Sequence, residues 1–438
     1  MTRLSSRDRA TCAGLRAAVL YPVPLFFDGR QYSSDSVTFR SILDWGSRFA
    51  SLDVITYVRP ATGTEGRFPI DAANVRIVKL SSSESRVRLY LTKAPLILFE
   101  MVRLIAKGRR RWDAVILFDS AFPNWVAYFA CKLFRVPVVL RMVGRYDLFV
   151  QESLKFEGPL KKLLGTLYGA FIRRFQVRAA REKRIVTDGD CGFANAEDRP
   201  GVGFCVETHL SETTLPRENP YARRRRGDEF RVLSVSRIHP VKGVHVLVGA
   251  VASLNRRGVP VALDIAGPTY GWKYGDYEDR IRRQVADAGI ERIRFHGFLR
   301  EGRDVDALWA GADAFVVPYT SNADGVPRVI FEAMTHGVPV IAARIGGIPR
   351  ALRDGETGLL VAPGDEDGLA RAIESLRNDE AKRRRLSEGA FAAAREHTTE
   401  AVSGKLAAKL CETALRGRSR EGERPRPCSS PVGRATER

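Results

Sequence analysis

The sequence predicts an α/β protein with two Rossmann-like domains, each built on a parallel sheet. Its 438 residues, of which 44% are hydrophobic, exceed what one such domain needs. Short β-branched runs alternate with helix-length amphipathic segments, which is typical of parallel strands joined by crossover helices. One stretch rich in Pro and Arg, residues 216–228, lacks hydrophobic periodicity and interrupts the alternation. We therefore expect domains over residues 1–218 and 219–400.

The first domain has the less regular pattern. Its expected strands are residues 17–21, 54–58, 75–80, 114–118, 138–142 and 184–187. Its expected helices are residues 36–49, 95–107, 125–134 and 160–184. Each assignment follows from the spacing of apolar residues, with period two in strands and about 3.6 in helices.

The second domain alternates more cleanly. Its expected strands are residues 231–235, 262–266, 293–296, 314–317 and 339–342. Its expected helices are residues 244–256, 276–288, 305–311, 328–336 and 366–377. Every strand ends near Gly, Pro or Ser, and open α/β sheets bind ligands beyond the carboxyl ends of their strands.

The end of the chain differs from both domains. A helix over residues 401–415 is expected to pack back on the first domain. Residues 416–438 contain mostly Arg, Gly, Ser, Glu and Pro and have almost nothing to bury, so this basic tail is expected to be disordered.

The composition limits the partners and the compartment. With 71 Lys and Arg against 51 Asp and Glu, the net charge of +20 favours an anionic partner. Nucleic acid is not expected, because the basic residues spread over both domains and no recognition module appears. The six cysteines lack paired spacing, which argues against a disulfide framework and favours a reducing compartment. With no signal peptide or membrane span expected, the predicted location is the cytoplasm.

Two cations mark the turn between the first strand and first helix of the second domain. Arg237 and Lys242 lie in the run Ser-Arg-Ile-His-Pro-Val-Lys-Gly, directly before a helix N-terminus with its unpaired amides. An Arg fork and a compact Lys charge together suit a diphosphate and need no metal. The alternative is a pair of solvated loop cations.

A second group of residues lies between Asp324 and Glu332. Gly325 and Pro327 precede a helix, so backbone amides at Val326, Arg328 and Val329 are expected to face the crevice. A carboxylate before the helix could hold sugar hydroxyls, and one two turns on could accept bonds from a ribose. Taken alone, a helix cap and a solvated glutamate explain the two acids better.

Metal binding is not predicted. Two Asp-x-Asp pairs occur, at Asp188 and Asp190 and at Asp304 and Asp306, but charged residues are frequent enough for such pairs to arise by chance. The second pair starts an expected helix, where Asp is a common cap. The six histidines show no ligand spacing, and no cofactor is expected to be required.

Several segments of the second domain, in order and at the usual spacing, resemble the family-four retaining glycosyltransferases of GT-B fold. These segments are residues 236–243, 264–267, 295–298, 312–318, 324–332, 337–342 and 355–361. The resemblance implies two Rossmann-like domains with an interdomain cleft. It also implies transfer of a hexose from a nucleotide diphosphate sugar, UDP-linked by default and GDP-linked as the second choice, to a glycan or lipid-linked acceptor in polysaccharide or glycolipid biosynthesis.

The resemblance also implies roles for individual residues. Arg237 and Lys242 would contact the diphosphate, Glu332 the ribose and Asp324 the donor sugar. Residues expected to line the donor site beside them are Gly297, Gly325, Val326, Arg328 and Val329.

This sequence departs from the family's pattern at three places. Asp324 stands where the family usually has Glu, a side chain one methylene longer. Val143 stands where a strand-end His is common, after the run Pro-Val-Val-Leu. The first loop carries one glycine, Gly29, where the family has a Gly-rich loop. Gly29, Arg141 and Arg145 are expected on the acceptor side, although water-facing loop charges remain an alternative for the two arginines.

Charge suggests a further partner for the first domain. In residues 160–184, Lys and Arg alternate with Leu, Phe, Tyr and Val, as in basic helices that lie on anionic membranes. A peripheral position on the inner face of the cell membrane is one interpretation, and a cation-coated helix packed on its own domain is the other. For the whole chain, an inactive donor-binding homologue and a sugar-nucleotide epimerase remain alternatives to the transferase.

Overall fold

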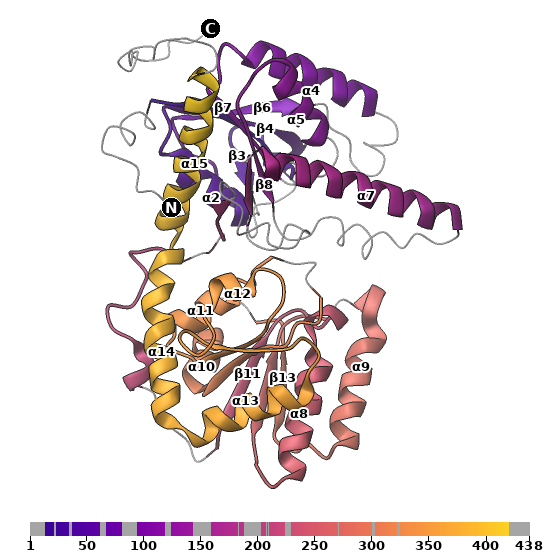
Figure 1. Ribbon diagram of the computed structural model, residues 1–438, viewed down its shortest axis with the longest axis vertical. Helices are drawn as coiled ribbons and strands as arrows, with labels where there is room; N and C mark the ends of the chain where they lie inside the picture. The colour runs from indigo at the N-terminus through magenta and orange to yellow at the C-terminus, as the bar shows by residue number, and fades with distance from the viewer. Residues whose placement is uncertain are drawn as a thin grey trace.

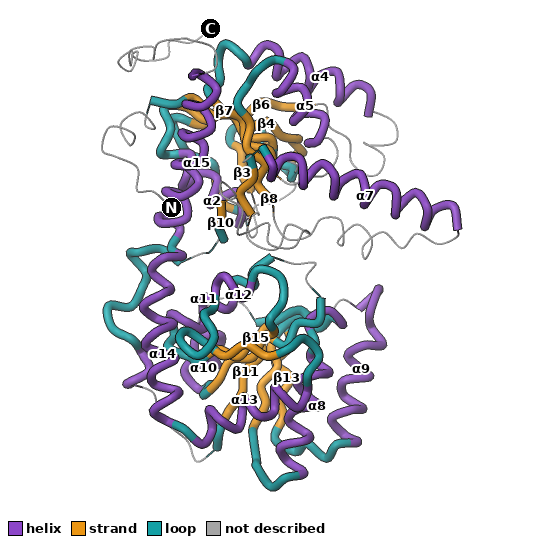
Figure 2. Tube along the Cα trace, in the orientation of Figure 1, coloured by secondary structure: helices purple, strands orange, loops and turns teal. Residues whose placement is uncertain are grey.

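The computed structural model contains two α/β domains, one above the other in Figure 1, and the tube in Figure 2 separates their strands from the surrounding helices. The described residues are 14–21, 23–34, 37–61, 67–80, 94–118, 124–142, 159–182, 184–187, 203–206, 208, 210–223, 229–269, 271–299, 303–321 and 325–419.

The first domain is built on a largely parallel sheet. Its main strands are β1 (Arg16–Leu20), β4 (Ser51–Pro60), β6 (Val75–Leu80), β7 (Ala114–Phe118), β8 (Val138–Met142), β9 (Ile185–Thr187) and β10 (Gly203–Phe204). The strands pair in the order β6-β4-β1-β7-β8-β9-β10, which is the doubly wound order of a Rossmann-like sheet. A smaller extension contains β2 (Leu25–Phe27), β3 (Tyr32–Ser34) and β5 (Phe68–Pro69).

Helices cover both faces of this sheet. The helices are α2 (Val37–Gly46), α4 (Ala94–Gly108), α5 (Asn124–Leu133) and α7 (Pro159–Arg181), with α15 (Thr399–Ser419) added from the end of the chain. Apolar side chains of α4, α5 and α7 pack in one core cluster, and those of α2 and α15 pack in another on the opposite face (Figure 1). The sheet is therefore buried between two layers.

The second domain has a wholly parallel sheet in the order β13-β12-β11-β14-β15-β16. Its strands are β11 (Arg231–Val235), β12 (Ala262–Ala266), β13 (Ile293–Gly297), β14 (Ala314–Val317), β15 (Val340–Ala343) and β16 (Leu359–Val361). Its longer helices are α8 (Val244–Arg256), α9 (Gly271–Asp287), α10 (Arg303–Gly311), α11 (Val329–Thr335), α13 (Glu366–Asn378) and α14 (Glu380–Ala394). The short elements are η1 (Pro220–Arg223), η2 (Pro240–Lys242), α12 (Ile348–Ala351) and η3 (Arg395–His397). The strand order reverses between β11 and β14, where such sheets bind ligands.

The expected main strands and helices are present with small shifts of their ends, but several elements were not predicted. The β2–β3 hairpin, β5, β10 and β16 are too short to show a period in the sequence. Helix α14 was missed because it carries an arginine run, yet Arg383 is buried and donates to the carbonyls of Leu376 and Arg377. Helix α15 continues past Leu415 to Ser419, into the segment expected to be disordered, and residues 420–438 lie outside the described part.

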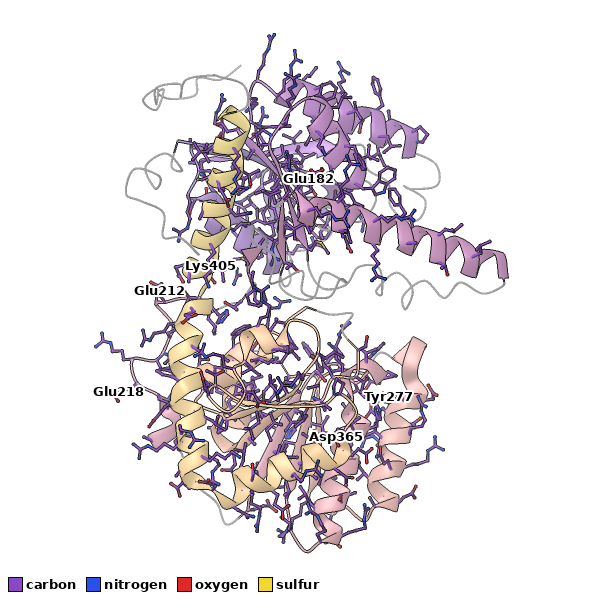
Figure 3. All side chains as sticks on the ribbon, in the orientation of Figure 1. Glu182, Glu212, Glu218, Tyr277, Asp365 and Lys405 are labelled. Carbon is purple, nitrogen blue, oxygen red and sulfur yellow. The ribbon has the colours of Figure 1, made fainter. Side chains whose placement is uncertain are left out.

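The chain crosses between the domains twice, and the two crossings lie side by side. Cys205 packs in a core cluster of the first domain, whereas Val206 packs in one of the second. The chain returns through η3 before α15 begins. The backbone N–H of Thr399 donates to the carbonyl of Leu210 (2.7 Å), and the hydroxyl of Thr208 donates to the carbonyl of His397. Figure 3 shows Glu212 and Lys405 at this junction.

Cysteine pairing departs from the prediction at one position. Cys131 and Cys205 are buried free thiols, whereas Cys411 of α15 is disulfide-bonded. Among the described residues, no helix is long and apolar enough to pass through a bilayer.

Two glycines let the strand-end loops of the second sheet touch. A Cβ on Gly243 (φ +67°) would lie 1.8 Å from the carbonyl oxygen of Pro318, beyond β14. A Cβ on Gly267 (φ +138°) would lie 1.9 Å from the carbonyl oxygen of Ser236, beyond β11. Both positions combine positive φ with direct backbone contact, which only glycine tolerates. The loops after β11, β12 and β14 are therefore fixed against one another.

Replacing Gly243 by Ala should destabilise the protein by at least about 2 kcal/mol, because strained φ and a backbone clash add. Gly258 is the matched control, since its φ is +73° but a Cβ there meets nothing within 4 Å. Gly258→Ala should cost only about 1 kcal/mol. Urea unfolding of the three proteins measures both values, and equal losses would show that Gly243 makes no essential contact.

Stability should also fall in mild acid because of His397. Burial, followed by nearby Lys405 and Arg353, lowers the pKa of His397 from 6.5 to about 4, and its ring packs 4.5 Å from that of Phe331. Below pH 6.5 the unfolded chain takes up a proton that the folded chain refuses, so stability drops as pH falls from about 6.5 to 4. The loss should approach about 3 kcal/mol. In His397→Phe, this part of the pH dependence of the unfolding free energy should vanish; an unchanged slope would contradict the assignment.

Candidate donor site

The sequence places Arg237 directly after β11, at the reversal point of the second sheet. The structure puts this side chain at the wall of a cavity of about 220 Å³. Backbone bonds hold the loop, since the N–H of Ser236 donates to Ala266 and that of Ile238 to Pro268, both at 3.0 Å. Arg237 is exposed and borders the cavity, so its contact with a diphosphate stays a prediction.

Lys242 lies deeper, at the end of η2. Its side chain is 6% exposed, and its Nζ lies 3.9 Å from the centre of the Tyr319 ring. The turn is set by His239, whose Nδ1 accepts a bond from the N–H of Val241 (3.3 Å), and by Thr320, whose N–H donates to the carbonyl of Val241 (3.0 Å). Lys242 is therefore a desolvated cation held beside the end of β14, and a solvated surface charge is excluded. Tyr319 was not singled out in the sequence, although it directly follows the Val-Pro that ends this strand.

Apolar side chains form most of the cavity wall. Phe298 and Leu299 come from the loop after β13, Leu308 and Trp309 from α10, and Val329 from the start of α11. Of these residues, only Val329 was predicted from the sequence. Trp309 stacks on His336 at a ring separation of 5.5 Å, which fixes the floor of the cavity. A flat apolar group bound here would have the Arg237 cation beside it.

None of the remaining predicted donor residues that the structure describes lines this cavity. Glu332 is half-buried on α11, Gly297 ends β13 at φ +63°, and Val326 is buried in the core beneath β14. Gly325 is half-buried and Arg328 is exposed at the N-terminal end of α11. Asp324 lies outside the described residues.

Polar groups in the sheet interior serve structural purposes. The Nε2 of His296 lies 2.7 Å from Oδ1 of Asp264, whose other oxygen accepts from Arg231 at 3.0 Å. Asp304 and Asp306 are in the first turn of α10, where acidic side chains stabilise a helix. Within the described ranges, no group of His, Cys, Asp and Glu could hold a metal ion. Asp188 and Asp190 lie outside those ranges.

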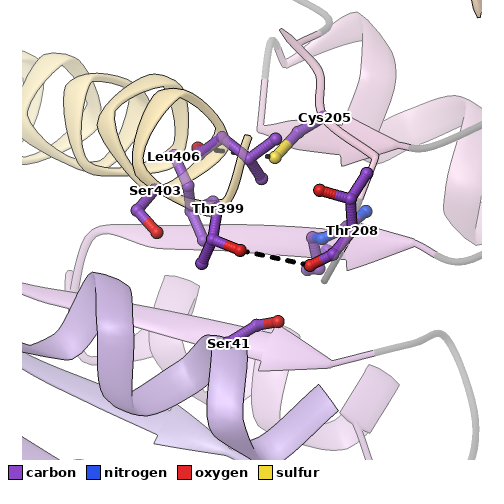
Figure 4. A pocket seen from close by; sticks show the side chains of 8 residues that line it. Ser41, Cys205, Thr208, Thr399, Ser403 and Leu406 are labelled. Atoms are coloured by element: carbon purple, nitrogen blue, oxygen red, sulfur yellow. Dashed lines mark hydrogen bonds between the residues drawn. The ribbon is translucent and has the colours of Figure 1, made fainter. Parts of the chain in front are cut away.

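On the first domain, the structure describes two of the predicted acceptor-side residues. Gly29 is exposed at the tip of the β2–β3 hairpin, with φ +98°. Arg141 is in β8 and only 1% exposed, so the alternative of a loop charge facing water is wrong for it. It lines a cavity of about 10 Å³ beneath α15, together with Ser41, Thr208 and Ser403 (Figure 4). Arg145 and Val143 lie outside the described residues.

The arrangement suits one kind of ligand. An apolar cavity takes a planar base, while an exposed arginine at its rim and a buried lysine on the same loop suit two linked phosphates. Positive charge held in place without solvent reorganisation also stabilises a leaving group that becomes more negative.

Comparison with known proteins shows what the second domain is similar to. Residues 217–392 match the family described as glycosyl transferases group 1. The lipopolysaccharide core biosynthesis glycosyltransferase LpsE of Rhizobium meliloti is 36% identical over 219 residues, covering 48% of this chain and 56% of that protein. A GDP-mannose-dependent phosphatidylinositol monomannoside mannosyltransferase of Mycolicibacterium smegmatis is 34% identical over 160 residues, covering 35% of this chain and 40% of that protein. The chain thus spans about half the length of the curated relatives it matches.

Solved structures match over nearly the whole chain. Anabaena HepE in complex with UDP and glucose aligns with a TM-score of 0.58 at 18% identity, covering 91% of this chain and 100% of that one. A glycosyltransferase from Rickettsia africae aligns with a TM-score of 0.60 at 16% identity, covering 92% and 98%. At such identities the likeness concerns the fold alone. The second domain is thus similar to the group 1 glycosyl transferases, and the two domains together have a GT-B fold.

Proposed function

We propose that this protein transfers a hexose from a nucleotide diphosphate sugar to a glycan or lipid-linked acceptor, with retention of the anomeric configuration. The observation that carries the proposal is the pairing of Arg237 at the rim of an apolar cavity with the buried Lys242 on the same loop. In transfer, the bond between the anomeric carbon and the phosphate oxygen breaks. The acceptor oxygen bonds to that carbon on the same face, and the leaving diphosphate takes the acceptor proton.

The roles of individual residues follow from charge and position. Arg237 and Lys242 stabilise the diphosphate as negative charge develops on it, which lowers the barrier without a required metal. Glu332 accepts bonds from the ribose hydroxyls, and Asp324 lies near the donor sugar. The acceptor docks on the first domain, and closure of the cleft between the domains aligns its hydroxyl.

UDP-sugars are the first choice of donor and GDP-sugars the second. One structural neighbour holds UDP and glucose, and one relative is named for GDP-mannose, so both bases belong in the test. The lipid-linked or glycan acceptor is supported by relatives named for lipopolysaccharide core and phosphatidylinositol mannoside synthesis. Such acceptors make cell-surface polysaccharide or glycolipid synthesis the proposed process.

Arg237→Ala and Lys242→Ala should each slow transfer on the order of 100-fold, because each removes a preorganised charge at the leaving group. Incorporation of labelled sugar into an acceptor extract measures the rate. Arg384→Ala is the control, since that exposed arginine of α14 pairs with Glu388 at 2.9 Å. Rates equal to the wild type in both site variants would refute the assignment.

A panel of nucleoside diphosphates and their sugars should identify the donor by thermal unfolding. A ligand at 100 times its dissociation constant stabilises by about 2.7 kcal/mol, and a non-binding nucleotide should leave the unfolding temperature unchanged. Mixing the stabilising nucleotide sugar with acceptor extract then distinguishes a transferase, an inactive homologue and an epimerase. Transfer supports the proposal, donor binding without turnover indicates the inactive homologue, and conversion of the free donor into its epimer indicates an epimerase.

A further inference from the structure

Large apolar side chains are exposed together on one side of the first domain. Among the described residues, seven exposed large hydrophobic side chains, between 37% and 74% accessible, lie on α4, α5 and α7. They are Leu96, Phe99, Phe129, Leu133, Leu163, Leu167 and Phe171. We call this set the apolar patch. Figure 1 shows these three helices on the side of the sheet opposite α15.

Helix α7 buries apolar side chains toward its C-terminal end and exposes others toward its N-terminal end. Phe175, Ala179 and Ala180 pack in the core cluster that also contains α5 and the sheet. Leu163, Leu167 and Phe171, spaced by four residues, are exposed, although Phe171 also contacts α5. The buried set suffices to hold a surface helix on its domain, so the exposed leucines are not needed for that purpose.

The helices of the patch are in contact with one another. The ring of Phe171 lies 5.1 Å from that of Trp125, and the ring of Phe129 lies 6.1 Å from that of Phe175, which brings α5 against α7. Apolar residues of α4 and α5 share the core cluster beneath them. The exposed side chains therefore belong to one continuous layer of helices.

The charge around the patch has one sign. The three helices contain nine Lys and Arg residues and a single acid, Glu100. Arg103, Lys107, Arg173, Arg174 and Arg181 are exposed. Arg178 lies over the ring of Phe129 at 5.8 Å, which places a cation directly beside the apolar side chains.

We propose that the apolar patch docks on an anionic lipid bilayer. The apolar side chains enter the interface, and the surrounding cations contact lipid phosphates. Two other occupants fit less well. A second copy would bring two strongly cationic surfaces together, and nucleic acid would leave the apolar side chains uncovered. The transferase proposal does not depend on this one, because the patch contains none of the donor-site residues.

The proposal predicts binding to vesicles that contain anionic lipid. The full-length protein should float with vesicles of phosphatidylcholine and phosphatidylglycerol, with a partition coefficient about tenfold or more above that for phosphatidylcholine alone. The triple variant Leu163→Gln, Leu167→Gln, Phe171→Gln and the double variant Arg173→Glu, Arg174→Glu should each lose about tenfold or more. Circular dichroism and thermal unfolding confirm that each variant is folded.

Two matched controls lie on the second domain. Arg384→Glu, Arg385→Glu changes the net charge as much as the double variant does, on exposed residues of α14. Phe298→Ser removes an exposed apolar side chain away from the patch. Both should bind vesicles within about twofold of the wild type.

Three results would overturn the proposal. These are equal or negligible binding to both kinds of vesicle, patch variants that bind as the wild type does, and a concentration-dependent dimer in solution that the triple variant abolishes. Donor-induced thermal stabilisation, measured on the triple variant and on the Arg173→Glu, Arg174→Glu variant, should be unchanged, because neither alters a donor-site residue. A failure of membrane binding is thus distinguishable from a failure of the transferase proposal.

Discussion

The candidate donor site depends on a backbone contact between neighbouring strand ends. Gly243 lies directly against the carbonyl of Pro318, and no residue with a Cβ fits there. This contact positions η2 beside the end of β14, which places Lys242 over the ring of Tyr319 and out of water. Gly267 makes the equivalent contact with Ser236 and aligns the loop that carries Arg237 with the cavity. The two cations owe their positions to packing of the main chain.

Helix α11 of the second domain contacts the segment through which the chain crosses back to the first domain. This helix carries Glu332 on one side, and on another Phe331 packs against His397 in η3, where the chain crosses back. Hydrogen bonds from Thr208 and Thr399 join this returning segment to the segment through which the chain first leaves the first domain. A change in the angle between the domains therefore acts close to the helix proposed to hold the ribose.

The sequence predicts regular elements well and their mutual contacts poorly. Buried strands such as Ala314–Val317 and amphipathic helices such as Val244–Arg256 show their periods locally, so their positions and the two-domain fold could be predicted. Arg237 and Lys242 could be singled out too, because they lie on one loop between a strand and a helix, and their roles stay predictions. The cavity wall was missed, since Phe298 and Trp309 come from two other elements and only the fold brings them to Arg237.

Besides the contacts between elements, the burial of individual side chains could not be predicted from the sequence. Arg141 follows an apolar strand pattern, and nothing local indicates that α15, more than 250 residues later, covers it. In the apolar patch the opposite occurs, because large apolar side chains are exposed there. The basic residues of α7 suggested a membrane-facing helix, but only the structure shows that its leucines and those of α4 and α5 are exposed together.

The central claim is that Arg237 and Lys242 bind a diphosphate. Isothermal titration of the wild type with a nucleoside diphosphate and with its monophosphate tests this directly, because the two ligands differ only in the phosphate that the cations would contact. The diphosphate should bind at least about tenfold more tightly, in keeping with roughly 1.5 to 3 kcal/mol for a charge-assisted bond, and Lys242→Ala should abolish the difference. Equal affinities for the two nucleotides in the wild type would contradict the account.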